Sequence, residues 1–205
     1  MATKTEAKRQ AILKVAAQVF QEFGYERTSM SEICARVGGS KATLYNYFSS
    51  KEELFCEVVN IPVEAAFEAV CRALDPAAED IAASLRSFGE QHLAFIYSPY
   101  IQANRHLAIS ESGHSELGRL VYERRVLCSQ KVASDKLREV MNLGKLRQAD
   151  PVVATQHLFS LLESELIDRF LYQLLGDVSP EEIKAVTARA VDVFMAAYCT
   201  PGDRE

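Results

Sequence analysis

The sequence predicts an all-α protein with about nine helices, in which a three-helix head containing a helix-turn-helix precedes a larger helical body. Apolar residues recur with a helical period along the chain, and no segment shows the alternation of a half-buried strand. Caps and glycine stops interrupt that period where helices should begin and end. The 205 residues are enough for a small head, expected over residues 1–50, and a larger body over residues 51–205.

The first expected helix covers residues 6–23 and ends at Gly24, because glycine accepts the left-handed conformation found at helix ends. Lys4, Lys8 and Arg9 lie near its start, where they would reach a neighbouring phosphate or the minor groove of DNA. Its apolar face consists of Ile12, Ala16, Val19, Phe20 and Phe23.

The second expected helix begins with a capping box, in which Ser29 is the cap and Glu32 follows three residues later. Gly38 and Gly39 end this helix and make the turn to the next one. The apolar face, spaced i, i+3, i+4 and i+7, consists of Met30, Ile33, Cys34 and Val37.

A third, short helix is expected over Lys41–Tyr47, with Ser40 as its N-cap. A helix this short cannot stand alone, and it carries small and hydrogen-bonding side chains where a buried helix would carry Leu and Val. The competing interpretation is an ordinary core hairpin, which would not place Lys, Thr, Asn and Tyr on its second helix. The side chains suited to phosphates and base edges are Ser40, Lys41, Thr43, Tyr45, Asn46 and Tyr47.

The run from Arg9 to Val59 closely resembles the N-terminal domain of TetR-family bacterial transcription regulators. The shared motifs are AxxVFxExGYxxTS, GxSKxTLYxYF and SKEEL, and the match needs no insertion or deletion over a run that is about a quarter of the chain. The resemblance implies that Thr28 and Ser29 hold one phosphate, that Lys51 holds another, and that Tyr45 and Tyr47 straddle the DNA backbone. It places in the major groove Ser40, Lys41, Ala42, Thr43 and Asn46.

Leu44 and Phe48 match family positions that pack inward. Two residues depart from the family pattern. Gly39 stands where an apolar side chain is usual, which would loosen the turn, and Ala42 stands where glycine is frequent and adds a methyl group that would contact a thymine methyl. A loosened turn keeps a rival interpretation open, namely a helical small-molecule-binding or scaffolding dimer whose head no longer binds DNA.

Charge is spread unevenly along the chain. Residues 1–51 carry a net +4 and the remainder a net −9, which together give −5. A basic head on an acidic body concentrates attraction for phosphate at one end. The N-terminus lacks the apolar region of a secretory signal, and no apolar run approaches the length of a membrane span. We therefore expect a cytoplasmic protein with no membrane partner.

Metal, cofactor and catalytic sites are not expected. The five cysteines are scattered without CxxC spacing, and the four histidines show no paired ligand spacing on one helix. This pattern fits a reducing cytosol, while a redox-sensing thiol stays open. GxSxG, P-loop, HExxH and GxGxxG motifs are absent from the sequence, which argues against an enzyme.

The body reads as successive helices, of which the first suits a connector between head and body. Asp150-Pro151 and Ser179-Pro180 each combine an N-cap with proline at the first helical position, so they open the last two. The expected ranges are 51–74, 78–97, 101–111, 115–142, 150–175 and a last helix from 180.

The last two helices are apolar on more than one face and so need two partners. One partner is the body's own core, and the other is expected to be the same helices of a second chain, as TetR-like proteins usually dimerise. The alternative is that both faces are buried within one chain. The expected dimer contacts are Leu158, Leu162, Leu166, Phe170, Val186, Ala190 and Phe194.

A ligand pocket is expected in the body, where aromatic residues lie beside polar ones. The alternative is that each histidine is a satisfied or surface residue; Gly89 would leave room either for a ligand or for close helix packing. The body also weakly resembles the C-terminal domain of a TetR subgroup linked to efflux control, through HLAISESGHSELGRLVYERR and GKLRQADPVVA. The expected pocket residues are Phe88, His92, Phe95, Glu111, Tyr122, Phe159 and Glu163.

Together these features predict a homodimeric regulator that binds double-stranded DNA at a palindromic operator. It is expected to be a repressor that a small apolar or amphipathic molecule releases. Two recognition helices related by a two-fold axis would meet two half-sites of the operator.

Overall fold

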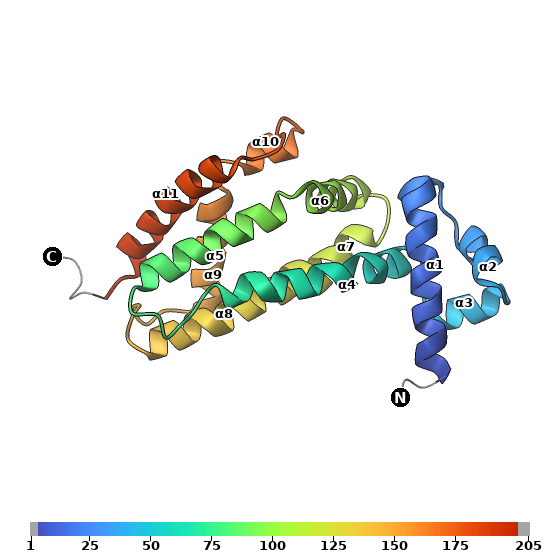
Figure 1. Ribbon diagram of the computed structural model, residues 1–205, viewed down its shortest axis with the longest axis horizontal. Helices are drawn as coiled ribbons and strands as arrows, with labels where there is room; N and C mark the ends of the chain where they lie inside the picture. The colour runs from blue at the N-terminus through green and yellow to red at the C-terminus, as the bar shows by residue number, and fades with distance from the viewer. Residues whose placement is uncertain (1–3, 201–205) are drawn as a thin grey trace. The chain divides into compact units, whose positions relative to one another are not determined.

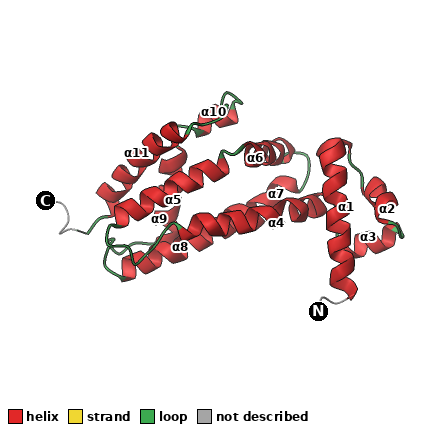
Figure 2. Cartoon of the chain, viewed as in Figure 1, coloured by secondary structure: helices red, strands yellow, loops and turns green. Residues whose placement is uncertain are grey.

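The structure, a computed structural model, describes residues 4–200, and every regular element in that range is a helix (Figures 1 and 2). This confirms the all-α prediction. No helix among the described residues combines the length and the apolar character that a membrane crossing requires. The helices are α1 Lys4–Arg27, α2 Met30–Val37, α3 Lys41–Tyr47, α4 Lys51–Arg72, α5 Ile81–Ile96, α6 Pro99–Glu111, α7 Leu117–Val121, the π-helix η1 Tyr122–Val126, α8 Leu127–Asn142, α9 Pro151–Glu163, α10 Ile167–Leu171 and α11 Pro180–Tyr198.

The described range holds eleven α-helices where about nine were expected, because two expected helices are interrupted. The one over 115–142 consists of α7, η1 and α8. The one over 150–175 consists of α9 and α10, separated by a turn in which the Ser164 hydroxyl donates to the Leu161 carbonyl at 2.7 Å. A serine hydroxyl competes in this way with the backbone hydrogen bonds of a helix. The apolar residues keep their helical spacing through both interruptions, so the sequence pattern did not reveal where the helices break.

The chain divides into two compact units. Unit 1 comprises Met1–Glu64 and Ser110–Glu123, and unit 2 comprises Ala65–Ile109 and Arg124–Glu205. Helices α4 and α6 therefore each contribute to both units. The expected boundary at residue 50 marks the start of α4, whereas the two units divide further along that helix.

Unit 2 is built around α5, α9 and α11, which pack against one another, with α8 against α9. Asp150 and Ser179 cap α9 and α11 as expected, each followed by proline. The seven side chains expected at a dimer interface all lie in this core and are buried within the single chain. Contact with a second copy through α9 and α11 would thus use their exposed side chains, such as Val152, Val153 and Val193.

Gly89 serves close packing of helices. A Cβ atom at this position of α5 would lie 2.7 Å from Thr187 Cγ2 on α11 and 2.8 Å from Leu162 Cδ2 on α9. Both distances are shorter than a carbon–carbon contact allows. Gly89 was expected to leave room either for a ligand or for close helix packing. The structure supports close packing, because α5, α9 and α11 meet at this residue.

Gly89→Ala is expected to lower the free energy of unfolding by ~1–2 kcal/mol, because overpacking costs more than the gain in helix propensity. Urea unfolding measures the change. Thr187→Ser removes the obstructing methyl group, so adding it to Gly89→Ala should recover part of the loss, read as a coupling in a double-mutant cycle. A more stable Gly89→Ala protein would contradict the packing described.

Candidate functional site

The head of unit 1 is held together by an aromatic and aliphatic core. Helix α1 is interrupted at Gly24, whose φ of 75° is left-handed, so the regular helix stops where the sequence predicted. Tyr25 then turns inward, and its ring packs 5.0 Å from that of Phe55 on α4 and 6.2 Å from that of Phe20. The apolar residues predicted for the inner face of α1 are buried, apart from the half-buried Phe23.

The helix-turn-helix has the predicted caps. The Ser29 hydroxyl accepts the backbone N–H of Glu32 at 3.2 Å, and the Ser40 hydroxyl accepts that of Thr43 at 3.1 Å. Gly38 and Gly39 have φ values of 72° and 121°, which side chains rarely adopt. Gly39 is therefore required by the backbone of the turn, and α3 covers the predicted range Lys41–Tyr47.

Helix α3 has one buried side and one exposed side. Leu44 within it and Phe48 at its end are buried, as their family positions imply. Tyr47 is half-buried. The side chains left on the exposed side are those of the predicted reading positions Lys41, Ala42, Thr43, Tyr45 and Asn46.

Two of the expected phosphate ligands have internal partners. Thr28 is buried, and its hydroxyl donates to the Gly24 carbonyl at 2.7 Å. The Lys51 ammonium donates to the Tyr25 carbonyl at 3.2 Å and lies 4.0 Å from the centre of the Tyr25 ring. Thr28 thus closes the end of α1, and Lys51 joins α4 to it, whereas Ser29 is exposed at the start of α2.

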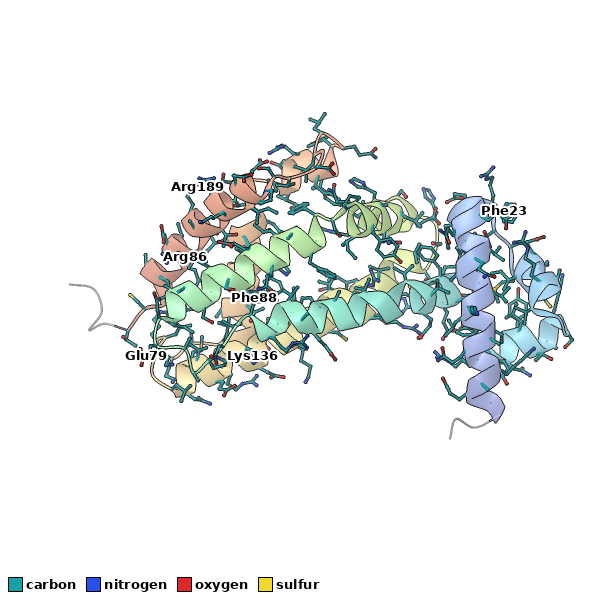
Figure 3. All side chains as sticks on the ribbon, viewed as in Figure 1. Phe23, Glu79, Arg86, Phe88, Lys136 and Arg189 are labelled. Carbon is teal, nitrogen blue, oxygen red and sulfur yellow. The ribbon has the colours of Figure 1, made fainter. Side chains whose placement is uncertain are left out.

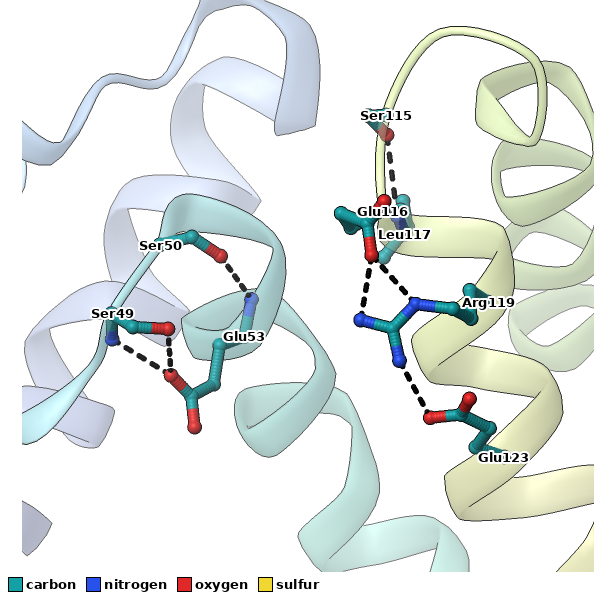
Figure 4. Close-up of polar contacts among 8 residues, drawn as sticks. All are labelled: Ser49, Ser50, Glu53, Ser115, Glu116, Leu117, Arg119 and Glu123. Carbon is teal, nitrogen blue, oxygen red and sulfur yellow. Dashed lines mark hydrogen bonds and ion pairs between the residues drawn. The ribbon is translucent and has the colours of Figure 1, made fainter.

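The junction between α3 and α4 is fixed by a second set of caps (Figure 4). The Ser50 hydroxyl accepts the backbone N–H of Glu53 at 3.1 Å, and the Glu53 carboxylate accepts the backbone N–H and the hydroxyl of Ser49, each at 2.7 Å. These bonds cap the first turn of α4, so α3 is joined to a well-defined helix start.

In unit 2 the residues expected in a ligand pocket meet around His92 on α5. Phe88 extends from α5 inside the unit (Figure 3), and its ring lies 5.7 Å from that of His92. The ring of Phe159 on α9 stacks on that of His92 at 4.6 Å and lies 6.2 Å from that of Phe88, so the three rings form one cluster. Burial lowers the pKa of His92 to about 4, so its imidazole is neutral near pH 7.

A second, polar cluster lies beside the aromatic one. It is centred on Glu163, which lies one helical turn after Phe159 on α9. The Glu163 carboxylate accepts the Tyr97 hydroxyl at 3.1 Å and an Arg105 N–H at 2.7 Å. The Arg105 guanidinium also lies 4.4 Å from the centre of the Phe170 ring. Burial raises the pKa of Tyr97, and the nearby Glu163 carboxylate adds to this rise.

Two expected pocket residues belong to unit 1. Glu111 at the end of α6 shares a hydrogen bond with Glu26, which raises the pKa of Glu26. Tyr122 is exposed on η1. Conversely, the His92 cluster includes Phe67 of α4, which was not predicted although its spacing from Val63 and Val70 follows the buried face of that helix.

Comparisons with known proteins agree with this arrangement. Residues 12–58 match the family described as bacterial regulatory proteins, tetR family. Residues 83–200 match the family described as AefR-like transcriptional repressor, C-terminal domain. The second match covers more than half of the chain.

Individual relatives show how far the likeness extends. A TetR-family transcriptional regulator from Mesorhizobium loti MAFF303099 has a TM-score of 0.80 and 25% identity, over 97% of this chain and 100% of that one. The flavonoid-responsive regulator FrrA has a TM-score of 0.73 and 30% identity, over 95% and 98%. The transcriptional activator FasR of Mycolicibacterium smegmatis is 39% identical over 69 residues, which are 34% of this chain and only 32% of FasR. The chain belongs to the TetR family of bacterial transcriptional regulators.

Proposed function

We propose that the chain is a ligand-responsive, DNA-binding repressor that leaves a palindromic operator when a small apolar or amphipathic molecule binds its body. The observation that carries this proposal is the exposed side of α3. Five side chains suited to DNA face outward there, while Leu44 and Phe48 anchor the helix from its other side. The positive φ of Gly39 and the Ser40 cap support an intact head over the alternative of a degenerate one.

The similarity of the body to a repressor domain supports repression as the direction of regulation. Residues 83–200 match a domain described as belonging to transcriptional repressors, whereas FasR, an activator by name, is similar only over a short segment. A palindromic operator also implies a homodimer, because the two recognition helices of the dimer would read the two half-sites. We place the dimer contact on α9 and α11 and the protein in the cytoplasm, where its DNA is.

The proposed effector acts through helices that contribute to both units. FrrA is flavonoid-responsive by name, which supports a small organic effector for this chain as well. Helix α4 runs from the head into unit 2, and α6 runs from unit 2 to Glu111, which contacts Glu26 of the head. Ligand that favours the non-binding spacing of the two heads would release DNA; equal affinity for both arrangements would change nothing.

Selection of binding sites from random duplex DNA is expected to yield a palindrome, bound by a dimer. Titration at two salt concentrations should show affinity falling steeply as salt rises, since each neutralised phosphate releases counterions. Placing the selected site at a reporter promoter then tests whether the protein represses or activates transcription. Failure to enrich any site at low salt would remove the proposed function and favour a small-molecule-binding dimer with a degenerate head.

A further inference from the structure

His92 is a buried polar side chain with unused hydrogen-bonding capacity. Only 4% of its surface is exposed. Neither Nδ1 nor Nε2 has a hydrogen-bond partner among the residues that the structure describes. Buried polar groups nearly always have partners in folded proteins, and a neutral imidazole offers one donor and one acceptor. Both groups therefore have hydrogen-bonding capacity that the described part of the chain leaves unused.

The surroundings of His92 are aromatic. Phe88 and Phe159 lie nearly parallel to the imidazole, and Phe67 meets it edge-on at a ring distance of 6.4 Å. Phe67 also contacts Phe95 at 6.0 Å. Phe67, Phe95 and Phe159 are only partly buried, so this cluster reaches the molecular surface. It therefore offers flat apolar faces to a ring that approaches His92.

A second unused donor lies in the neighbouring polar group. Arg105 uses Nη2 for its ion pair with Glu163, but its Nη1 is buried and has no partner among the described residues. Glu163 follows Phe159 by four residues on α9, so it lies on the same side of that helix. The aromatic cluster and the free guanidinium N–H thus belong to one region of unit 2.

We propose that this region binds an uncharged aromatic compound with a phenolic hydroxyl, which donates its proton to the free acceptor nitrogen of His92. Its ring packs against the partly buried Phe67, Phe95 and Phe159, and a further ligand oxygen accepts from Arg105 Nη1. A carboxylate lacks the proton that the acceptor nitrogen needs, and an ammonium lacks an acceptor for the two free N–H groups. The inference rests on the proposed function, because it names the chemical class of the proposed effector.

The test compares 2-naphthol with 2-methoxynaphthalene, which has the same rings but no hydroxyl proton. The chain has no tryptophan, so naphthol fluorescence can be followed without an indole background. Full-length protein should bind 2-naphthol at least about tenfold more tightly than the ether, because the ether leaves the His92 acceptor unpaired. Absent binding of 2-naphthol, or equal binding of both compounds, would overturn the proposal.

His92→Phe keeps an aromatic ring but removes the acceptor, so it should bind the two compounds equally. His114→Phe is the matched control, since His114 is exposed in unit 1, and it should keep the preference. Retained preference in His92→Phe overturns the assignment. If His92→Phe does not fold, the wild-type comparison is repeated with 4-phenylphenol and 4-methoxybiphenyl, and the same criterion decides. Operator selection is carried out without ligand. A failure of the proposed DNA-binding function would therefore appear in that selection, and a failure of the proposed phenol site would appear only in the ligand-binding measurements.

Discussion

Tyr45→Ala is expected to weaken operator binding at least about tenfold while leaving the stability of the protein unchanged. The Tyr45 side chain is 48% exposed on the outer side of α3. The residues that hold α3 in place, Leu44 and Phe48, point the other way. Removing the phenol ring therefore takes away DNA contact area without opening the core of the head.

Titration of the selected operator, with thermal unfolding measured alongside, checks this result. Tyr172→Ala is the matched control, because Tyr172 is also an exposed tyrosine but lies in unit 2. It should bind the operator as the wild type does. Wild-type affinity in Tyr45→Ala would show that α3 does not read DNA through its exposed side. Lys51→Ala is a poorer probe, since the contacts of Lys51 with Tyr25 mean that its loss disturbs the head itself.

The head was predictable because its signals are local. A cap and the N–H it accepts are three residues apart, as in Ser29–Glu32 and Ser40–Thr43, and a glycine turn needs only its own backbone. Sequence order alone therefore located α2 and α3. The partner of Lys51 was hidden, since Lys51 contacts a carbonyl 26 residues away that no spacing rule connects to it. Thr28 donates to the Gly24 carbonyl only four residues earlier, which is a local contact.

The body was predictable only in outline. Helical periodicity shows that α9 and α11 are apolar on several faces, but it does not show which element covers each face. Leu158 and Phe194 were assigned to a second chain, yet they are buried by helices of their own chain. In the same way, the ion pair of Arg105 with Glu163 joins residues 58 positions apart, so nothing local pointed to Arg105.

Phe170→Ala is expected to lower the free energy of unfolding by about 3–5 kcal/mol, the usual cost of removing a fully buried phenyl ring. None of the Phe170 surface is exposed. The imidazole of His106 stacks on its ring at 4.1 Å, and the guanidinium of Arg105 lies 4.4 Å from its centre. The substitution opens a cavity and also removes the surface against which two polar side chains are positioned.

Urea unfolding at two protein concentrations separates this role from the predicted role at a dimer interface. A ring buried within one chain gives the same loss of stability at both concentrations, relative to wild type. A ring buried only by a second chain costs stability at a concentration where the protein is dimeric and nothing at one where the folded protein is monomeric, because it acts through association. Leu171→Ala is the adjacent control: that side chain is 48% exposed, so its loss should cost less than about 1 kcal/mol. A small effect of Phe170→Ala at either concentration would contradict the core described for unit 2.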